Sequence, residues 1–265
     1  MPPLHDLPAS LWVIELVGIT GIAATPVYLL YTGALRSGAG RRRAALLAAA
    51  AAVLLGGWFA ASAVIAAHGG YENQLGHRVP WLPVAVLGFL AARLALGRIP
   101  AVTRALDRPD MIGPLLIPHT FRLAGVVFLA AIALGRMPAL FALPAGLGDI
   151  ATGIAAALVA RRLSRDPGGR GALSVNVFGT IDLLLALTLG ALTAFGLVNV
   201  TPPNQLIGEL PFALIPTAAV PLLLALHLRS LLTLRKTRPS SAAAVRNADD
   251  LSAQRAGRGS ATSRT

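Results

Sequence analysis

Seven stretches of about 20 predominantly apolar residues run through this sequence, and they restrict what the chain can fold into. They cover residues 11–35, 44–67, 79–97, 112–135, 141–160, 172–196 and 210–234. A helix of this length spans the hydrocarbon core of a bilayer and satisfies its own backbone hydrogen bonds there. The strict alternation of a transmembrane β-barrel is missing. The sequence therefore predicts an all-α polytopic membrane protein, a bundle of seven transmembrane helices.

The composition supports a membrane setting. Only 13% of the residues are charged, about half the share of an ordinary soluble domain, and the mean hydropathy is +0.69. The chain has no Cys, which excludes disulfides, thiolate metal sites and Cys nucleophiles.

The basic residues predict the orientation of the spans, because Arg and Lys remain on the cytoplasmic side. Eighteen of them follow spans one, three, five and seven, whereas the alternate loops hold only Arg78 and Arg136. The N-terminus is therefore expected outside and the C-terminus in the cytoplasm. Residues 1–10 hold no Arg or Lys, so the first span is not expected to be a cleaved signal peptide. The Arg- and Ala-rich composition is typical of a bacterial chain from a high-GC genome, so the predicted location is the bacterial plasma membrane.

The net charge of +12 follows from the same distribution. The excess lies in the inner loops and the tail, without the interleaved aromatic residues of a stacking surface. We therefore expect contact with the lipid bilayer and its anionic headgroups, and no nucleic-acid binding.

Three parts are predicted along the chain. Residues 1–110 form an N-terminal three-helix membrane part that ends in an amphipathic connector, Ile99 to Asp110. Residues 111–234 form a four-helix membrane core. Residues 235–265 are expected to be a disordered basic cytoplasmic tail, because they hold almost no large apolar residues.

Charged residues inside the spans are the candidate functional residues, since each costs about 2.5–3.5 kcal/mol at the centre of a membrane helix. Arg122 and Asp182 each lie ten residues into a span that runs from inside to outside, a depth of roughly 15 Å. We therefore expect them to form an ion pair near the midplane. Such a pair either fixes helix packing or forms a gate or proton-linked site.

Three further polar residues, His119, Asn176 and His227, lie within roughly 6–10 Å of the inner surface. The spacing of His119 and Arg122 places both on one helix face. The three are expected to form a polar pocket open to the cytoplasm. As an alternative, His119 and His227 could ligate a haem b iron axially. No carboxylate has ligand spacing to these histidines, so no metal site is predicted.

Asp149 follows Pro144 and two glycines near the outer end of span five. This pattern predicts an irregular helix start whose free N–H groups the carboxylate caps. The alternative is a contact with a substrate or cation. Glu15, about one turn inside span one, is expected either to face the same outer cavity or to reach the headgroups.

Two further features concern helix packing. Pro216 and Pro221 in span seven should leave the carbonyls of Phe212 and Thr217 without their usual helical donor. In span six, Gly179 belongs to a face of small residues that allows a neighbouring helix to approach closely.

Several enzyme classes lack their motifs here. There is no phosphate loop, no His-Glu-x-x-His zinc motif and no Gly-x-Ser-x-Gly elbow. The single lysine, Lys236, lies beyond the last span and cannot carry a retinal Schiff base. These observations favour a protein that is not an enzyme.

Four blocks within residues 112–234 resemble a group of uncharacterised bacterial multi-pass integral membrane proteins. The blocks are Phe121-Arg122-Leu-Ala-Gly125 with Phe128-Leu129, Leu143-Pro144-Ala-Gly-Leu-Gly-Asp149 with Gly153, Asn176-Val-Phe-Gly179-Thr-Ile-Asp182-Leu, and Leu214-Ile-Pro216-Thr217 with Val220-Pro221 and His227. The resemblance implies a membrane protein and supplies no activity or site residue.

Three function classes follow. The leading hypothesis is a small transporter, permease-like or accessory membrane protein with a polar path, whose candidates are Arg122, Asp149, Asp182, Asn176 and His227. The second is a membrane-bound haem or redox protein that uses His119 and His227. The third is a structural membrane subunit. Homo- and hetero-oligomers both remain open.

Overall fold

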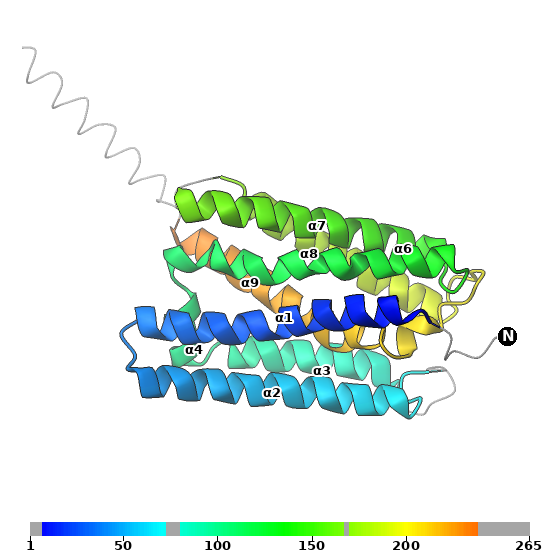
Figure 1. The fold of residues 1–265 in the computed structure, drawn as a ribbon, viewed down its shortest axis with the longest axis horizontal. Coiled ribbons are helices and arrows are strands. Elements are labelled where there is room, and N and C mark those ends of the chain that lie inside the picture. The colour runs from blue at the N-terminus through cyan, green and yellow to red at the C-terminus, as the bar shows by residue number, and fades with distance from the viewer. Residues whose placement is uncertain (1–6, 73–79, 167–169, 238–265) are drawn as a thin grey trace, which may run out of the picture.

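The computed structural model describes residues 7–72, 80–166 and 170–237, in which every regular element is helical. Long helices lie side by side along one direction (Figure 1). They are α1 (Ala9–Arg36), α2 (Arg41–Ala67), α3 (Trp81–Leu96), α7 (Ala139–Arg165), α8 (Ala172–Ala194) and α9 (Val220–Thr237). The predicted disordered tail lies outside the described residues, apart from 235–237, which continue α9.

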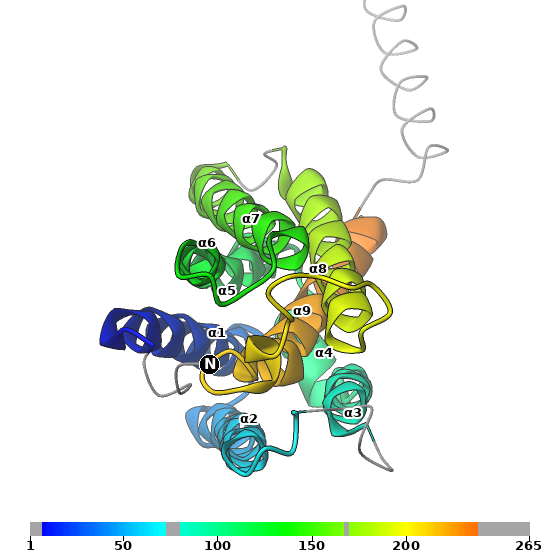
Figure 2. The ribbon, with the colours of Figure 1, turned by 90° about the vertical axis from the view of Figure 1, so that its right-hand side faces the viewer.

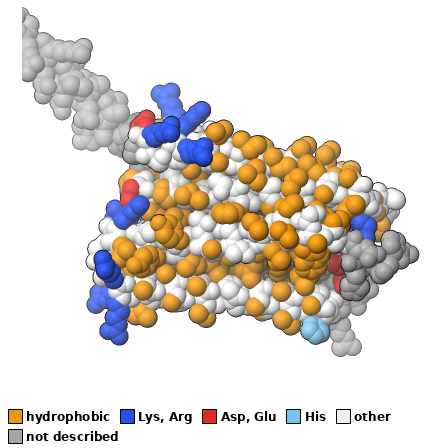
Figure 3. Space-filling model, viewed as in Figure 1, with side chains coloured by type: hydrophobic (Ala, Val, Ile, Leu, Met, Phe, Trp, Pro, Cys, Tyr) orange, Lys and Arg blue, Asp and Glu red, His pale blue; other side chains and the backbone are white. Residues whose placement is uncertain are grey.

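Six helical segments are long and apolar enough to cross a membrane, and a seventh results if α3 and the short α4 (Pro100–Leu106) form one bent span. The prediction of an all-α chain with several helices apolar enough to span a membrane is therefore confirmed for the described residues. Large apolar side chains such as Val53, Leu87 and Ile181 point outward and are more than half exposed. Figure 3 shows hydrophobic side chains along the length of the bundle, while Arg and Lys gather mainly at one end.

The third predicted span is bent rather than straight. α3 ends at Leu96, and α4 leaves it at an angle of 83°. The residue before a proline is disfavoured in the helical region, and Ile99, which precedes Pro100, is extended with ψ 128°. The predicted connector from Ile99 to Asp110 is thus α4 followed by the single turn η2 (Pro109–Met111).

The fourth predicted span is a chain of short helical turns instead of one α-helix. It follows η2 of the connector and consists of η3 (Pro114–Leu116), α5 (Ile117–Thr120), η4 (Phe121–Gly125) and α6 (Val126–Ala133). Prolines 109, 114 and 118 lack the amide hydrogen that an α-helix requires, so tighter 3₁₀ turns alternate with α turns. Arg122 lies in one of these turns, η4.

The seventh predicted span starts later than expected, with the π-helical turn η6 (Ile215–Ala219) leading into α9. The two carbonyls expected to lack helical donors both find partners. The carbonyl of Phe212 accepts from the amide of Ile215 at 3.0 Å, and that of Thr217 accepts from Trp58 Nε1 at 2.9 Å. Trp58 of α2 thus supplies the hydrogen-bond donor that Pro221 lacks.

α9 occupies the middle of the bundle, with the other long helices around it (Figure 2). One apolar core joins α1, α2 and α3 to α8 and α9, through residues such as Leu29, Leu55 and Leu222. α1 also packs against η4, where Arg122 lies. The N-terminal helices therefore form part of the wall around the candidate site.

Candidate functional site

Arg122 lies at the centre of a buried charged cluster. Its Nε donates to Asp149 Oδ1 at 2.7 Å, and its Nη2 donates to Asp182 Oδ2. Its Nη1 donates to the Gly179 carbonyl at 3.5 Å and to His227 Nε2 at 3.4 Å. The ion pair expected between Arg122 and Asp182 is therefore present. Asp149 joins it as a second carboxylate.

Three glycines make room for this cluster. A β-carbon at Gly148 of α7 would overlap the Asp182 carboxylate, and one at Gly179 of α8 would overlap the His227 ring. A β-carbon at Gly125 would overlap the side chain of Asp149. The close approach predicted at Gly179 is confirmed. It brings an imidazole, rather than only a helix backbone, against α8.

A hydrogen-bonded chain leads from Arg122 along α8 and α9. Asn176 donates through Nδ2 to the Ala172 carbonyl at 2.7 Å and to Ser230 Oγ at 3.0 Å. Because a carbonyl can only accept, the amide oxygen of Asn176 must face His227 Nδ1, 2.9 Å away. His227 therefore carries its proton on Nδ1 and accepts at Nε2, where Arg122 donates. This chain holds His227 as a neutral imidazole in a fixed orientation.

His119 stacks on His227, with ring centroids 3.7 Å apart and an interplanar angle of 19°. His119, Asn176 and His227 are fully buried, so the pocket expected to open to the cytoplasm is instead a closed cluster. Axial ligation of a haem needs two ring nitrogens that point at an iron from opposite sides of the porphyrin. Two rings in face-to-face contact do not provide that arrangement, so the residues present do not fit a haem.

Asp149 does not cap a helix start, and that prediction is wrong. α7 begins at Ala139 and continues through Pro144, so Asp149 lies in its interior. Pro144 lies in the second turn, so it removes the hydrogen bond that the Leu140 carbonyl would accept, and the helix nevertheless continues past it. Asp149 is consequently free to turn its carboxylate inward toward Arg122.

A small cavity adjoins the cluster on the side of α1. It is lined by Glu15, Arg122, Gly125 and Asp149, among others. Its volume is about 30 Å³, enough for about two waters. Glu15 is buried and makes no hydrogen bond within the part of the chain that the structure describes. Of the two positions expected for Glu15, the structure shows the one that faces the cavity.

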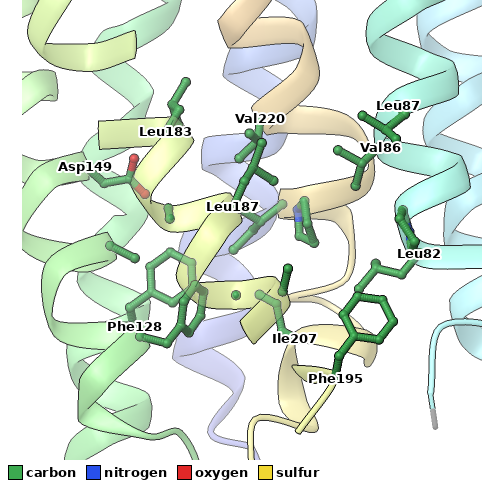
Figure 4. A pocket seen from close by; sticks show the side chains of 18 residues that line it. Leu82, Val86, Leu87, Phe128, Asp149, Leu183, Leu187, Phe195, Ile207 and Val220 are labelled. Carbon is green, nitrogen blue, oxygen red and sulfur yellow. The ribbon is translucent and has the colours of Figure 1, made fainter. Parts of the chain in front are cut away.

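A larger apolar groove reaches Asp149 from the other side (Figure 4). α3 and α8 contribute many of its lining residues, and α6, α7 and the start of α9 contribute others. Its volume is about 210 Å³. Leu82, Val86, Phe128 and Leu187 are among its lining residues, and Asp149 is the one ionisable side chain among them. Asp149 therefore lies between the groove and the Glu15 cavity.

The three charged partners differ in their access to these spaces. The side chains of Arg122 and Asp182 are 1% and 8% exposed, and Asp182 lines neither the groove nor the Glu15 cavity. The Asp149 side chain is 15% exposed and lines both. The Arg122–Asp182 pair is thus a closed contact, whereas the Asp149 carboxylate is accessible.

Sequence reasoning missed part of the cluster. Ser230 and the unpartnered, buried hydroxyl of Thr152 were not among the candidates. Gly148 could have been recognised as a candidate, because it directly precedes Asp149 within a span. For Ser230 and Thr152 there was no such signal, since single hydroxyls are common in membrane helices.

Comparisons with known proteins give one match. No curated protein and no solved structure matches the chain significantly. The family model described as a domain of unknown function, DUF8737, matches residues 79–235. The matched region runs from α3 to α9 and includes Arg122, Asp149 and Asp182, while Glu15 precedes it. Because the match covers more than half of the sequence, the chain belongs to the DUF8737 family.

Proposed function

We propose that this protein is a small multi-pass transporter of the bacterial plasma membrane that exchanges a hydrophobic organic cation for protons. Asp149 would bind the cationic group, and the groove between α3 and α8 would hold the apolar part. The observation that carries the proposal is the position of Asp149, a partly exposed carboxylate at the meeting point of an apolar groove and a polar cavity.

The charge balance of the cluster supports a cationic substrate. Glu15, Asp149 and Asp182 are three carboxylates around one guanidinium, that of Arg122. If all were ionised, the cluster would hold two uncompensated negative charges, and each buried ion costs several kcal/mol when it is not paired. Protons or a bound cation must therefore neutralise it. A proton and a bound cation would compete for the same carboxylate, and this competition is the physical basis of exchange.

The basic end of the bundle supports an orientation with the N-terminus outside and the C-terminus in the cytoplasm. The C-terminal ends of α1, α7 and α9 and the N-terminal end of α2, which carry basic residues, lie at this end (Figure 1). Labelling of single cysteines in proteoliposomes or whole cells tests this, because the chain has no native Cys. Gly40→Cys at the basic end should be protected from an impermeant thiol reagent in cells, while Leu197→Cys should react.

Binding of tetraphenylphosphonium to the purified full chain tests the substrate class. We expect saturable binding that weakens as the pH falls, loss of binding in Asp149→Asn, and unchanged binding in Asp110→Asn, an exposed carboxylate far from the groove. Ala186→Trp should also block binding, because it fills the groove and leaves the cluster intact. Binding that is equal in all variants, or independent of pH, would refute the proposal.

A structural subunit is the second candidate function. It is favoured by the closed Arg122–Asp182 contact, which connects η4 to α8, and by the closed His119–His227 contact, which connects α5 to α9. Absence of tetraphenylphosphonium binding, together with co-purification of a stoichiometric partner, would support this candidate.

A further inference from the structure

Another cavity lies at the basic end of α3, away from the Asp149 groove. Its charged lining residues are mostly positive, whereas the charged residue of the groove is negative. Its volume is about 420 Å³, and it lies between α1, α2, α3, α4 and α9. It shares no lining residue with the Asp149 groove. The function proposed above does not use it.

The cavity exists because α3 is short. At 16 residues, α3 is about 24 Å long and does not cross the full thickness of a bilayer. The chain then turns by 83° into α4, which runs across the bundle. The stacked rings of Trp58 and Phe89, with centroids 4.8 Å apart, join α2 to α3 within the length of α3. Beyond the C-terminal end of α3, the space between α2 and α9 is left open.

The walls of the cavity are apolar. They come from Pro26 and Leu30 of α1, Leu47 and Leu54 of α2, and Leu222 of α9, among others. Leu54 is 53% exposed, so the cavity is continuous with the outer apolar surface of the bundle. A hydrocarbon chain from the surrounding bilayer would therefore meet a wall of matching polarity.

One end of the cavity is strongly basic. Arg93, Arg98, Arg229 and Lys236 line it, with Asp107 as the one carboxylate among the lining residues. Asp107 already accepts from Arg229 Nη1 at 2.7 Å and from Lys236 Nζ at 3.2 Å. The lining thus has three uncompensated positive charges.

Arg93 differs from the other three cations in having a buried donor without an acceptor among the described residues. Its Nε is buried and donates to no acceptor in the part of the chain that the structure describes. Arg229, by contrast, also donates to the carbonyls of Gly97 and Val102. Arg93 therefore has a free hydrogen-bond donor in the cavity wall that could bind an anionic ligand.

We propose that this cavity binds one anionic phospholipid of the inner leaflet. The phosphate would contact Arg93, Arg98 and Lys236, and one acyl chain would lie between α1, α2 and α9. Basic pockets between membrane helices on the cytoplasmic side are suited to such headgroups. The cavity lies at the end of the bundle where the basic loops gather, so charge and location agree (Figure 3).

Native mass spectrometry of the full chain, with added phosphatidylglycerol or phosphatidylcholine, tests the proposal. We expect one phosphatidylglycerol to remain bound and to raise the Tm in detergent, and phosphatidylcholine to do neither. Arg93→Gln and Arg98→Gln should each weaken binding about five-fold. Arg161→Gln is the matched control, because Arg161 is exposed on α7 and outside the cavity.

Two results in the lipid experiments would overturn the proposal, and a third can come from phosphate alone. One is equal retention of the two lipids, and the other is unchanged phosphatidylglycerol binding in the Arg93→Gln/Arg98→Gln double variant. A third arm uses inorganic phosphate alone. If phosphate reproduces the full rise in Tm, the site recognises a soluble anion and the lipid is not its ligand. Leu54→Glu, which leaves the basic end intact, should reduce lipid binding without affecting phosphate.

Discussion

Removal of the Arg122 charge should destabilise the protein strongly, because Arg122 holds two buried carboxylates at once. In Arg122→Gln, Asp182 remains 8% exposed without its cation, and Asp149 loses a 2.7 Å hydrogen bond. Breaking a buried ion pair by removing one partner costs about 3–5 kcal/mol, since the other charge stays buried. We expect a loss in the free energy of unfolding within this range.

The assay is reversible unfolding in mixed micelles with increasing dodecyl sulfate, followed by tryptophan fluorescence. The double variant Arg122→Gln/Asp182→Asn should recover at least half of the loss, because it removes the stranded charge as well. Arg36→Gln is the control. Arg36 is 52% exposed and 3.6 Å from Asp110, so its loss should cost less than about 1 kcal/mol.

Two outcomes would refute this reasoning. A loss below about 1 kcal/mol in Arg122→Gln would mean that water or protons already compensate the cluster without the guanidinium. A double variant no more stable than Arg122→Gln would mean that the stranded Asp182 charge is not the source of the cost.

Substitutions at Gly148, Trp58 and Glu209 test three separate parts of the structure in the same unfolding assay, with Gly56→Ala as the control for the first. Gly148→Ala should cost about 1–3 kcal/mol because its β-carbon overlaps the aspartate of α8 in the cluster, while Gly56→Ala, which has open space around it, should be neutral or slightly stabilising. Trp58→Phe should cost about 1–3 kcal/mol because it keeps an aromatic ring but leaves the Thr217 carbonyl without its donor. Burial, together with the neighbouring carboxylate of Glu72, raises the pKa of Glu209 in the loop before η6. Its protonated form therefore favours the folded state, so stability should decline as the pH rises from the ordinary glutamate range through the raised pKa. Glu209→Gln should flatten that decline. A steeper decline would contradict it.

The spans and their most costly polar residues could be read from the sequence. Apolar length determines whether a segment can cross a bilayer, and that property is local to each segment. Counting residues from the basic end placed Arg122 and Asp182 at equal depth, and the structure pairs them. Depth is additive along a helix, so it needs no knowledge of neighbouring helices.

Facing directions and helix breaks could not be read in the same way. Asp149 was expected to cap a helix start and instead pairs with Arg122, because α7 continues through Pro144. The rotation of each helix about its axis depends on its neighbours, and whether a helix ends at an interior proline or continues past it also depends on the surrounding packing. The stacking of His119 on His227 likewise depends on how the turns of the fourth span rotate its side chains.

The sequence by itself predicted an all-helical chain with several segments apolar enough to cross a membrane and a few ionisable residues within them, since hydropathy and charge are properties of short segments. Only the tertiary structure decided which of those residues are closed and which are accessible. It placed Asp182 in a sealed contact and Asp149 between a groove and a cavity. It also brought Glu15 of the first helix beside them and gathered the basic residues around the space beyond the C-terminal end of α3. The physical reason is that accessibility depends on the packing of several helices far apart in the chain.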